Sequence, residues 1–248
     1  MTTQVALVGG SGRLGRIIHA VIDELDGFTV RNVLGSGSDL RELAGADLIV
    51  DASTPAVSIE VVRAALESGV NVLVGTSGWS QERISLVRPL VASDASGVVF
   101  IPNFSLGSAL GTALAAAAAP FFPFAEIVES HRDTKIDSPS GTAVRTAELM
   151  TDARIESGPF HAPHVDQRAR GQQVAGIPVH SLRRPGVIAR QEAILSGPGE
   201  TLSIVHDTAD SAAAYAPGIR LALPFARDAH GIVVGLENII DIGIGTRS

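Results

Sequence analysis

Cysteine is absent from this sequence of 248 residues. Its absence excludes disulfides, thiolate metal sites, iron–sulfur clusters and a cysteine nucleophile. A chain without cysteine suits a reducing compartment, and residues 1–4 lack the basic start of a signal peptide. We therefore expect a cytoplasmic protein.

Charge is also scarce. Charged residues make up 18% of the sequence, below the usual ~25%. The 19 Lys and Arg residues against 26 Asp and Glu give a net charge of −7, so no basic surplus exists for nucleic acid and we expect no such partner. A hydrophobic fraction of 45% supplies a buried core and argues against disorder.

One uncharged stretch, residues 95–125, is long enough to raise the question of a membrane span. Three prolines (Pro102, Pro120 and Pro123) and Asn103 interrupt it, and much of the remainder is Ala, Gly and Ser. We therefore expect no membrane partner. The stretch instead predicts a buried strand, a turn and a helix of small residues.

Short apolar runs alternate with helical patterns over residues 1–104. Strands are predicted at Val5–Val8, Phe28–Leu34, Leu48–Val50, Val70–Val74 and Val98–Ile101, and helices at Leu14–Leu25, Ile59–Leu66 and Arg83–Val91. This alternation is typical of βαβ units. It predicts an α/β fold with an N-terminal Rossmann-like, doubly wound parallel sheet.

The pattern changes after this part of the chain. Strands are predicted at Glu126–Glu129, Val179–Leu182, Val187–Leu195 and Thr201–His206, with a helix from about Ala143 and a long flexible loop over residues 154–178. These elements predict a central α+β domain with an open mixed sheet. From about Ala216 the chain becomes helical and then apolar.

Three glycines mark the turn between the first strand and the first helix. Gly9, Gly12 and Gly15 are each three residues apart, a variant of the dinucleotide-binding fingerprint. Glycines there permit a tight turn and let backbone N–H groups approach a pyrophosphate at the helix N-terminus. The pattern favours dinucleotide binding, and the alternative is a tight turn without a ligand.

The acid that usually contacts the ribose 2′-hydroxyl about 20 residues later is missing. Counting from Gly15 leads to Gly35. Because a carboxylate would repel a 2′-phosphate, its absence favours NADPH. Ser36, Ser38 and Arg13 are candidates to bind that phosphate, and the alternative is a flexible loop. We expect NADPH and/or NADH as cofactor, with NADPH accepted at least as well.

Residues 129–143 gather a second set of functional groups. His131 can exchange a proton near neutral pH, and Lys135 is a cation that can also pass a proton. The Ser140–Thr142 segment opens a helix, whose free N–H groups bind carboxylates. Together they would hold and protonate an anionic substrate; the alternative is a solvated loop in which two aspartates cancel the cations. No metal site is predicted, because Pro163 prevents a helical His161–His164 pair.

Several of these motifs together resemble the dihydrodipicolinate reductase family. They are Gly9–Gly15, Gly75–Gly78, Pro102–Phe104 and above all Lys135–Ala143, with later matches at 176–183, 199–202 and 234–237. The resemblance implies reduction of 4-hydroxy-tetrahydrodipicolinate, a small dicarboxylate, to tetrahydrodipicolinate by NAD(P)H, in diaminopimelate and lysine biosynthesis. It also implies a homotetramer built by the central sheet.

The resemblance implies a role for each matching position. His131 and Lys135 would be the catalytic proton donors or acceptors, and Ser140, Gly141 and Thr142 would bind the substrate carboxylate. The cofactor would contact Gly9, Gly10, Ser11, Gly12, Arg13, Leu14, Gly15, Ser36, Gly75, Thr76, Ser77, Ile101, Pro102, Asn103 and Phe104. Since the family's C-terminal tail returns to the nucleotide domain, residues 1–104 and 216–248 would bind the dinucleotide. Residues 105–215 would bind substrate and form the oligomer.

The sequence departs from the family at a few positions. Arg132 replaces a second histidine, Arg190 another histidine, Ser77 a threonine, and the segment 211–214 lacks the usual arginine. We expect Arg132 to bind a substrate carboxylate, and the alternative is a surface pair with Asp133. Two other functions stay open: a related reductase resembling aspartate dehydrogenase, and a non-catalytic NAD(P) sensor.

Overall fold

The computed structural model describes residues 1–91 and 96–241. The chain divides into two units, unit 1 (Met1–Leu106 with Tyr215–Ile240) and unit 2 (Gly107–Ala214). Each unit has its own sheet and its own buried core. The last residues of the expected 216–248 segment, 242–248, lie outside the described ranges.

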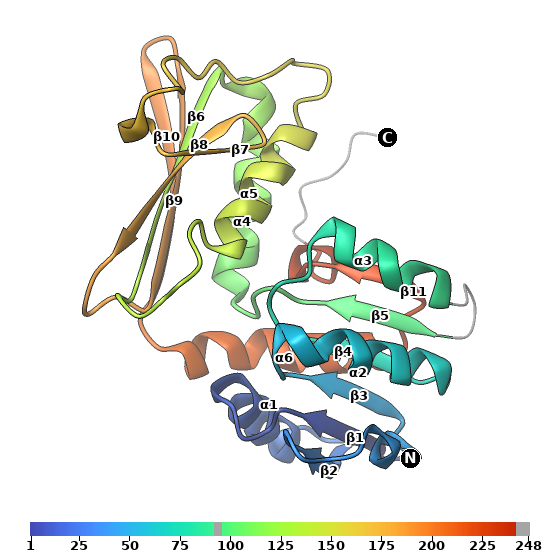
Figure 1. The fold of residues 1–248 in the computed structure, drawn as a ribbon. Coiled ribbons are helices and arrows are strands. Elements are labelled where there is room, and N and C mark those ends of the chain that lie inside the picture. The colour runs from blue at the N-terminus through green and yellow to red at the C-terminus, as the bar shows by residue number, and fades with distance from the viewer. Residues whose placement is uncertain (92–95, 242–248) are drawn as a thin grey trace. The chain divides into compact units, whose positions relative to one another are not determined.

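Unit 1 contains a six-stranded parallel sheet in the order β11-β5-β4-β3-β1-β2 (Figure 1). Its strands are β1 (Thr3–Val8), β2 (Phe28–Leu34), β3 (Leu48–Asp51), β4 (Asn71–Val74), β5 (Gly97–Phe100) and β11 (Gly231–Val234). Its helices are α1 (Arg13–Glu24), α2 (Pro55–Glu67), α3 (Gln81–Val87) and most of α6 (Ser211–Arg227). The short β3 and β5 are buried along their length, and β4 is buried except at its first residue, as expected for strands covered on both faces.

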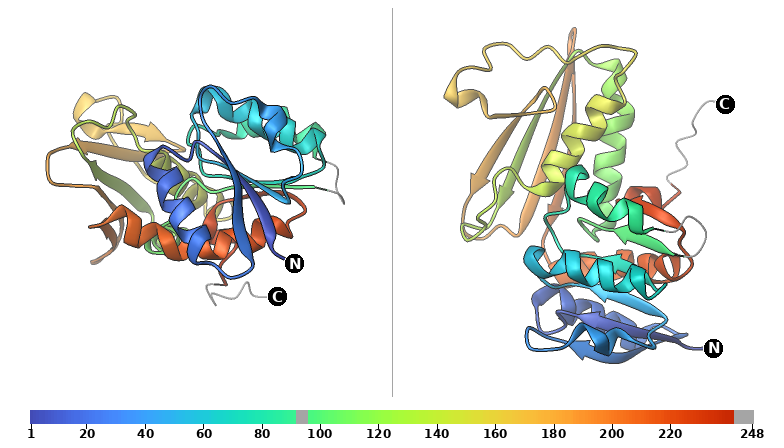
Figure 2. Two further views of the ribbon diagram at one scale, coloured as in Figure 1. Left: turned by 90° about the horizontal axis from the view of Figure 1, so that it is seen from below. Right: turned by 45° about the vertical axis from the view of Figure 1, so that its right-hand side comes forward.

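Helices cover both faces of this sheet, with α2 and α3 on one face and α1 and α6 on the other (Figure 2). One core joins alternate strand residues such as Ile49, Val72 and Val98 to Val61 and Val62 of α2. The intervening residues of the same strands, such as Leu73 and Val99, are also fully buried. This layering confirms the predicted doubly wound sheet. The tail contributes β11, which pairs in parallel with β5.

Unit 2 contains a five-stranded mixed sheet in the order β10-β9-β6-β8-β7. The strands are β6 (Phe124–His131), β7 (Gln172–Val174), β8 (Ile177–Arg183), β9 (Ala189–Gly197) and β10 (Glu200–Thr208), and the helices are α4 (Leu106–Ala118) and α5 (Gly141–Asp152). Both helices lie on one face of the sheet (Figure 1). Within the described part of this unit, no α-helix covers the opposite face, so the predicted open mixed sheet is confirmed.

Several element boundaries differ from the sequence expectation. The strand expected at Glu126–Glu129 runs from Phe124 to His131, and β9 begins at Ala189 rather than Val187. The segment 154–178 is not entirely a loop, since it contains β7 and the start of β8. The helix expected to reach Val91 ends as an α-helix at Val87 and continues as a 3₁₀ turn (Arg88–Leu90) because Pro89 cannot continue an α-helix.

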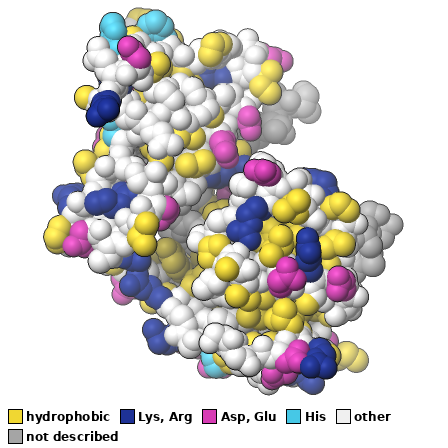
Figure 3. Space-filling model, viewed as in Figure 1, with side chains coloured by type: hydrophobic (Ala, Val, Ile, Leu, Met, Phe, Trp, Pro, Cys, Tyr) yellow, Lys and Arg dark blue, Asp and Glu magenta, His cyan; other side chains and the backbone are white. Residues whose placement is uncertain are grey.

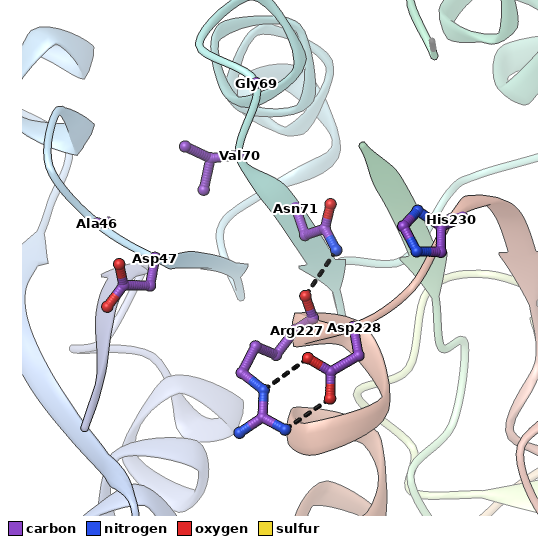
Figure 4. A pocket seen from close by; sticks show the side chains of 8 residues that line it. All are labelled: Ala46, Asp47, Gly69, Val70, Asn71, Arg227, Asp228 and His230. Carbon is purple, nitrogen blue, oxygen red and sulfur yellow. Dashed lines mark hydrogen bonds and ion pairs between the residues drawn. The ribbon is translucent and has the colours of Figure 1, made fainter. Parts of the chain in front are cut away.

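Asn71 connects β4 to the end of α6 within unit 1. Its Nδ2 donates to the carbonyl oxygens of Ala226, Arg227 and Ala229 at 2.8–2.9 Å, and its Oδ1 accepts from Gly97 N at 2.7 Å. Figure 4 shows Asn71 pointing to Arg227 at the edge of a shallow pocket that Asp47, Asp228 and His230 also line. One amide side chain therefore satisfies the C-terminal carbonyls of a helix and the start of a strand.

We predict that Asn71→Ala lowers the free energy of unfolding by about 2–3 kcal/mol, because several backbone groups each lose a hydrogen bond with the Asn71 amide. Urea unfolding of the full chain measures this. Asn238→Ala is the control, since Asn238 is exposed and donates one hydrogen bond, to Val234 O. Equal urea midpoints for the two variants would contradict the prediction.

Candidate functional site

The carboxyl ends of four strands in unit 1 lie in register. Val8 pairs with Asp51, Asp51 with Val74, and Val74 with Phe100. The turns that follow these residues therefore meet at one edge of the sheet. In doubly wound sheets ligands bind at this edge, where the chain order reverses, here between β1 and β3.

Two positions around the turn after β1, Gly9 and Gly15, are packed too tightly for any residue but glycine. Gly9 has a φ of +82°, and a Cβ there would lie 2.4 Å from Ala52 O. A Cβ on Gly15 would lie 2.2 Å from Gly9 O. Gly12 is the N-cap of α1 and provides no side-chain hydrogen bond to the first turn. The helix N-terminus therefore keeps N–H donors and a partial positive charge, which fit the pyrophosphate of a dinucleotide.

The structure brings several other predicted cofactor residues to the same edge. A Cβ on Gly75 would lie 2.8 Å from the Phe104 ring and 2.9 Å from Leu14, so these three residues pack together. Thr76 Oγ1 donates to Asp51 O at 3.3 Å. Ser77 and Pro102 are exposed, whereas Ile101 is buried and its amide donates to Val74 O. Ile101 therefore contributes its backbone and packing rather than a polar side-chain contact.

Sequence reasoning missed a buried acid at this edge. Asp51 is fully buried and accepts hydrogen bonds from Ser53 N at 3.0 Å, Ser53 Oγ at 2.5 Å and Ser58 Oγ. Ser58 Oγ in turn accepts from Trp79 Nε1 at 2.8 Å. This series of hydrogen bonds connects the turns after β3 and β4 and holds them in place. A polar residue at the end of an apolar run was the available signal.

Of the three predicted 2′-phosphate residues, two are exposed and Ser38 is half-buried. Ser36 and Arg13 are exposed, and Ser38 Oγ accepts from Gly35 N at 3.1 Å. Asp39, the first acid after β2, is bonded to Arg41 Nε at 2.8 Å, and this hydrogen bonding lowers the pKa of Asp39. Its charge is therefore balanced locally. Arg13 has no ion pair within the described residues.

In unit 2, the predicted catalytic segment runs from the end of β6 to the start of α5. His131 ends β6, and Ser140 is the N-cap of α5, where its Oγ accepts from Ala143 N at 3.3 Å. The structure therefore places His131, Lys135 and the Ser140–Thr142 segment on one connecting loop and its two flanking element ends.

Glu129 is the buried centre of this segment, with a side chain that is 0% exposed. Its carboxylate accepts from His131 Nδ1 at 2.6 Å and from Ser140 N at 3.1 Å. Both terminal nitrogens of Arg183 donate to it at 2.9 Å. Burial by itself raises the pKa of Glu129, but the hydrogen bonds from His131 and Arg183 outweigh it and lower the pKa to about 2. The carboxylate is therefore ionised at neutral pH.

Lys135 is also held by an acid. Its Nζ donates to both carboxylate oxygens of Asp137, at 2.6 and 2.7 Å. Burial raises the pKa of Asp137, and the Lys135 hydrogen bond outweighs this and lowers it. Arg183 reaches the same loop, where it donates to the carbonyl oxygens of Lys135 at 3.3 Å and Asp137 at 2.7 Å. Sequence reasoning assigned no role to Arg183, which is 54 residues from Glu129 in the chain.

Arg132 is exposed and makes no hydrogen bond or ion pair through its side chain to any residue that the structure describes. The surface pair with Asp133 is therefore not observed. Gly141 is also exposed at the first position of α5. The amide of Ser140 is engaged by Glu129, so Ser140 has its hydroxyl hydrogen left to donate.

Other features bear on competing functions. Within the described ranges, no group of three or more His, Asp or Glu side chains is arranged to hold a metal ion. None of the helices in those ranges is long and apolar enough to cross a membrane. On the face shown in Figure 3, cationic and acidic side chains are interspersed.

Comparisons with known proteins agree over the whole chain. The family model "Dihydrodipicolinate reductase, N-terminus" matches residues 3–104, and "Dihydrodipicolinate reductase, C-terminus" matches residues 107–240. The 4-hydroxy-tetrahydrodipicolinate reductase of Clavibacter sepedonicus is 55% identical over 98% of this chain and 87% of that protein. Its counterpart in Beutenbergia cavernae is 40% identical over 98% of this chain and 100% of that protein.

A solved structure gives the same result for the fold. Dipicolinate-bound dihydrodipicolinate reductase from Paenisporosarcina sp. TG-14 matches with a TM-score of 0.78 and 28% identity, over 97% of this chain and 100% of that one. An NAD(H)-bound scyllo-inositol dehydrogenase from Lactobacillus casei, at 12% identity, over 96% of this chain and 93% of that one, and a TM-score of 0.61, shows likeness of fold alone. By sequence and by fold, this chain belongs to the dihydrodipicolinate reductase family.

Proposed function

We propose that this chain is a 4-hydroxy-tetrahydrodipicolinate reductase in diaminopimelate and lysine biosynthesis. The substrate, NAD(P)H and one proton give tetrahydrodipicolinate, NAD(P)⁺ and water. The relatives named above support the reaction, and the dipicolinate in the Paenisporosarcina enzyme is a dicarboxylate of the expected kind. The observation that carries the proposal is the His131–Thr142 segment, which combines two proton-carrying groups, an unpaired Arg132 and a helix start.

The cofactor fits unit 1. The close-packed glycines 9, 12 and 15 and the uncapped start of α1 would hold the pyrophosphate, and the Gly75–Ser77 and Ile101–Phe104 turns would surround the nicotinamide end. When bound, the reduced nicotinamide supplies a hydride, which is the difficult chemistry of this reaction. The residues of unit 1 bind and orient it. Residues 1–104 with the returning tail are accordingly proposed as the dinucleotide-binding domain.

The substrate is bound and protonated by unit 2. Its two carboxylates are attracted by Arg132, Lys135 and the N–H groups at the start of α5. The 4-hydroxyl group and a neighbouring ring hydrogen first leave together as water, which gives a conjugated cyclic imine. Hydride addition to this imine leaves an electron pair on the substrate, and Lys135 Nζ provides the proton that neutralises it, with His131 assisting. Asp137 holds the ammonium group in place while it is charged. Residues 105–215 are thus proposed as the substrate domain.

Self-association is proposed through the open sheet face of unit 2. Val128 on β6 lies beside His180, Glu192 and, one strand further, Val205, which is 46% exposed. An uncovered sheet face with such exposed apolar side chains favours burial against another copy. We propose a homotetramer. We also propose a cytoplasmic location, where amino-acid biosynthesis has access to NAD(P)H.

We predict that the wild-type chain oxidises NAD(P)H with enzymatically generated 4-hydroxy-tetrahydrodipicolinate. Lys135→Ala and His131→Ala should lose about 10²–10⁴-fold in kcat, the usual contribution of a positioned acid or base. Both variants should retain cofactor affinity, because neither residue belongs to unit 1. Steady-state kinetics and calorimetric cofactor titration measure the two effects. Absence of wild-type turnover would refute the proposed substrate, and full kcat in both variants would refute the assigned roles.

For the cofactor, we predict that NADPH binds at least as tightly as NADH. Arg13→Ala should weaken NADPH binding about tenfold, or about 1.4 kcal/mol, and leave NADH binding unchanged, since only NADPH carries the 2′-phosphate. Arg16→Ala is the matched control, because Arg16 is exposed about one turn further along α1. Calorimetry that shows NADH binding more than tenfold tighter, or equal losses in the two variants, would contradict this.

For Arg132, we predict a rise in KM and an unchanged kcat in Arg132→Ala, because a carboxylate contact present in both ground and transition states changes KM alone. Loss of a charge-assisted bond of ~1.5–3 kcal/mol corresponds to roughly 10- to 150-fold in kcat/KM. Arg132→His should recover part of this at acidic pH. Arg168→Ala, which also removes an exposed arginine, should leave KM unchanged. An unchanged KM in Arg132→Ala would exclude the contact.

For assembly, we predict a particle of about four times the chain mass of 25.6 kDa. Val205→Asp, on the open face, should shift the particle toward smaller species because a charge would be buried at the interface. Light scattering at micromolar concentration measures both. A wild-type monomer would exclude the homotetramer.

A further inference from the structure

The Glu129 carboxylate is the acceptor at the centre of a cluster of hydrogen bonds. It is fully buried, and its donors are His131 Nδ1, Ser140 N and the two terminal nitrogens of Arg183. These donors come from the end of β6, the start of α5 and the neighbouring β8. All three are elements that carry or adjoin the proposed catalytic loop. Burying a charge is costly unless it is paired in this way.

The bond to His131 determines which ring nitrogen can exchange a proton. An ionised carboxylate can only accept, so the 2.6 Å contact requires the hydrogen on Nδ1. In the neutral ring, Nε2 then carries the lone pair, and in the charged ring it carries the proton that can leave. The His131 side chain is 17% exposed, so the ring is also held by its surroundings.

The other half of the cluster acts on the loop backbone. Arg183 pairs with His131 across the β6–β8 ladder, and its guanidinium spans from Glu129 to the carbonyl oxygens of Lys135 and Asp137. A planar guanidinium with several fixed donors is suited to such bridging. The position of Lys135 along the loop therefore depends on the Glu129–Arg183 pair.

On the basis of the proposed function, we infer that Glu129 and Arg183 are positioning residues for catalysis. Glu129 determines the tautomer of His131 so that Nε2 is the proton-exchanging atom. Arg183 binds both Glu129 and the Lys135 carbonyl oxygen and so positions Lys135 relative to His131. The pair acts through His131 and Lys135. Its removal should therefore lower kcat and leave cofactor binding unchanged.

The same strand contains a matched control. Glu126 also binds a histidine and an arginine, with its Oε2 2.8 Å from His180 Nε2 and its Oε1 accepting from Arg170. It lies on the opposite face of β6 and is 35% exposed. It contacts none of the proposed catalytic residues. Glu126→Gln thus removes a charge and similar bonds without touching the loop. Because Glu126 and His180 lie on the open sheet face, light scattering confirms that this variant keeps the particle mass of the wild type.

The first experiment compares kcat, KM and thermal unfolding of wild type, Glu129→Gln, Glu129→Asp and Glu126→Gln. Glu129→Gln should lose about 10²-fold or more in kcat, because a wrong tautomer alone costs up to ~10⁴-fold in a comparable Asp–His pair. Glu129→Asp retains the charge for Arg183 and should recover part of the loss. Glu126→Gln should keep kcat within about twofold of wild type, and the KM for NADPH should not change in any variant.

The second experiment reads the tautomer directly and needs no substrate. Nitrogen-15 NMR of histidine-labelled protein at about pH 8.5, where free imidazole is neutral, should show the Nδ1–H form for His131. The signal is assigned by its loss in His131→Gln. In Glu129→Gln the new amide can donate to Nδ1, so the Nε2–H form should appear. The His131 signal should not change in Glu126→Gln.

The outcomes separate this inference from the proposed function. A wild-type chain that does not turn over the substrate refutes the function, whereas the NMR result still tests the tautomer. An Nε2–H form in the wild type overturns the inference, even if the Glu129 variants fail to fold. Equal kcat losses in folded Glu129→Gln and Glu126→Gln also overturn it, since the effect would then be a general loss of charge on β6.

Discussion

A single buried carboxylate organises the chemistry of unit 2. Glu129 must be paired to remain buried and ionised, and its partners come from three separate elements. Satisfying that charge therefore fixes the end of β6, the start of α5 and the Arg183 end of β8 relative to one another. The requirement is local, but it determines where the proton carriers of the loop lie. The same hydrogen bonds thus satisfy the buried charge and position the residues that we propose as catalytic.

In unit 1 the candidate cofactor site is formed mainly by close packing of the backbone. There the in-register strand ends bring several turns to one edge, and glycines let these turns come closer than any side chain would allow. Side-chain polar contacts at this edge include those of the fully buried Asp51 with Ser53 and Ser58, and that of Ser58 with Trp79. The edge therefore offers N–H donors and shape, which suit a large cofactor with its own reactive group. Proton-transfer groups are concentrated instead in unit 2.

Sequence patterns predicted the parts of the structure that depend on neighbouring residues. The alternation of apolar runs and helices gave the doubly wound sheet, and the glycine spacing gave the turn after β1. They did not predict contacts between distant residues, such as Glu129 with Arg183 or Ser58 with Trp79, because no local pattern links such positions. The β7 strand was missed since Gln172–Val174 lies in a segment rich in glycine, proline and polar residues. The groups that Ser140 and Arg132 can offer a ligand could not be predicted either, because they depend on three-dimensional contacts: Glu129 binds the Ser140 amide, whereas the Arg132 side chain has no partner among the described residues.

Charge pairing within the loop explains how it can attract a dianion although its composition is balanced. Counted by composition, Asp133 and Asp137 cancel Arg132 and Lys135. In the structure Asp137 binds Lys135, Glu129 binds His131 and Arg183, and Arg132 is exposed without a partner among the described residues. Glu129 and Asp137 are thus each held against a cation or a histidine, whereas Asp133 is exposed beside Arg132 in the sequence. The unpaired guanidinium and the exposed start of α5 remain available for the substrate carboxylates in the proposed function.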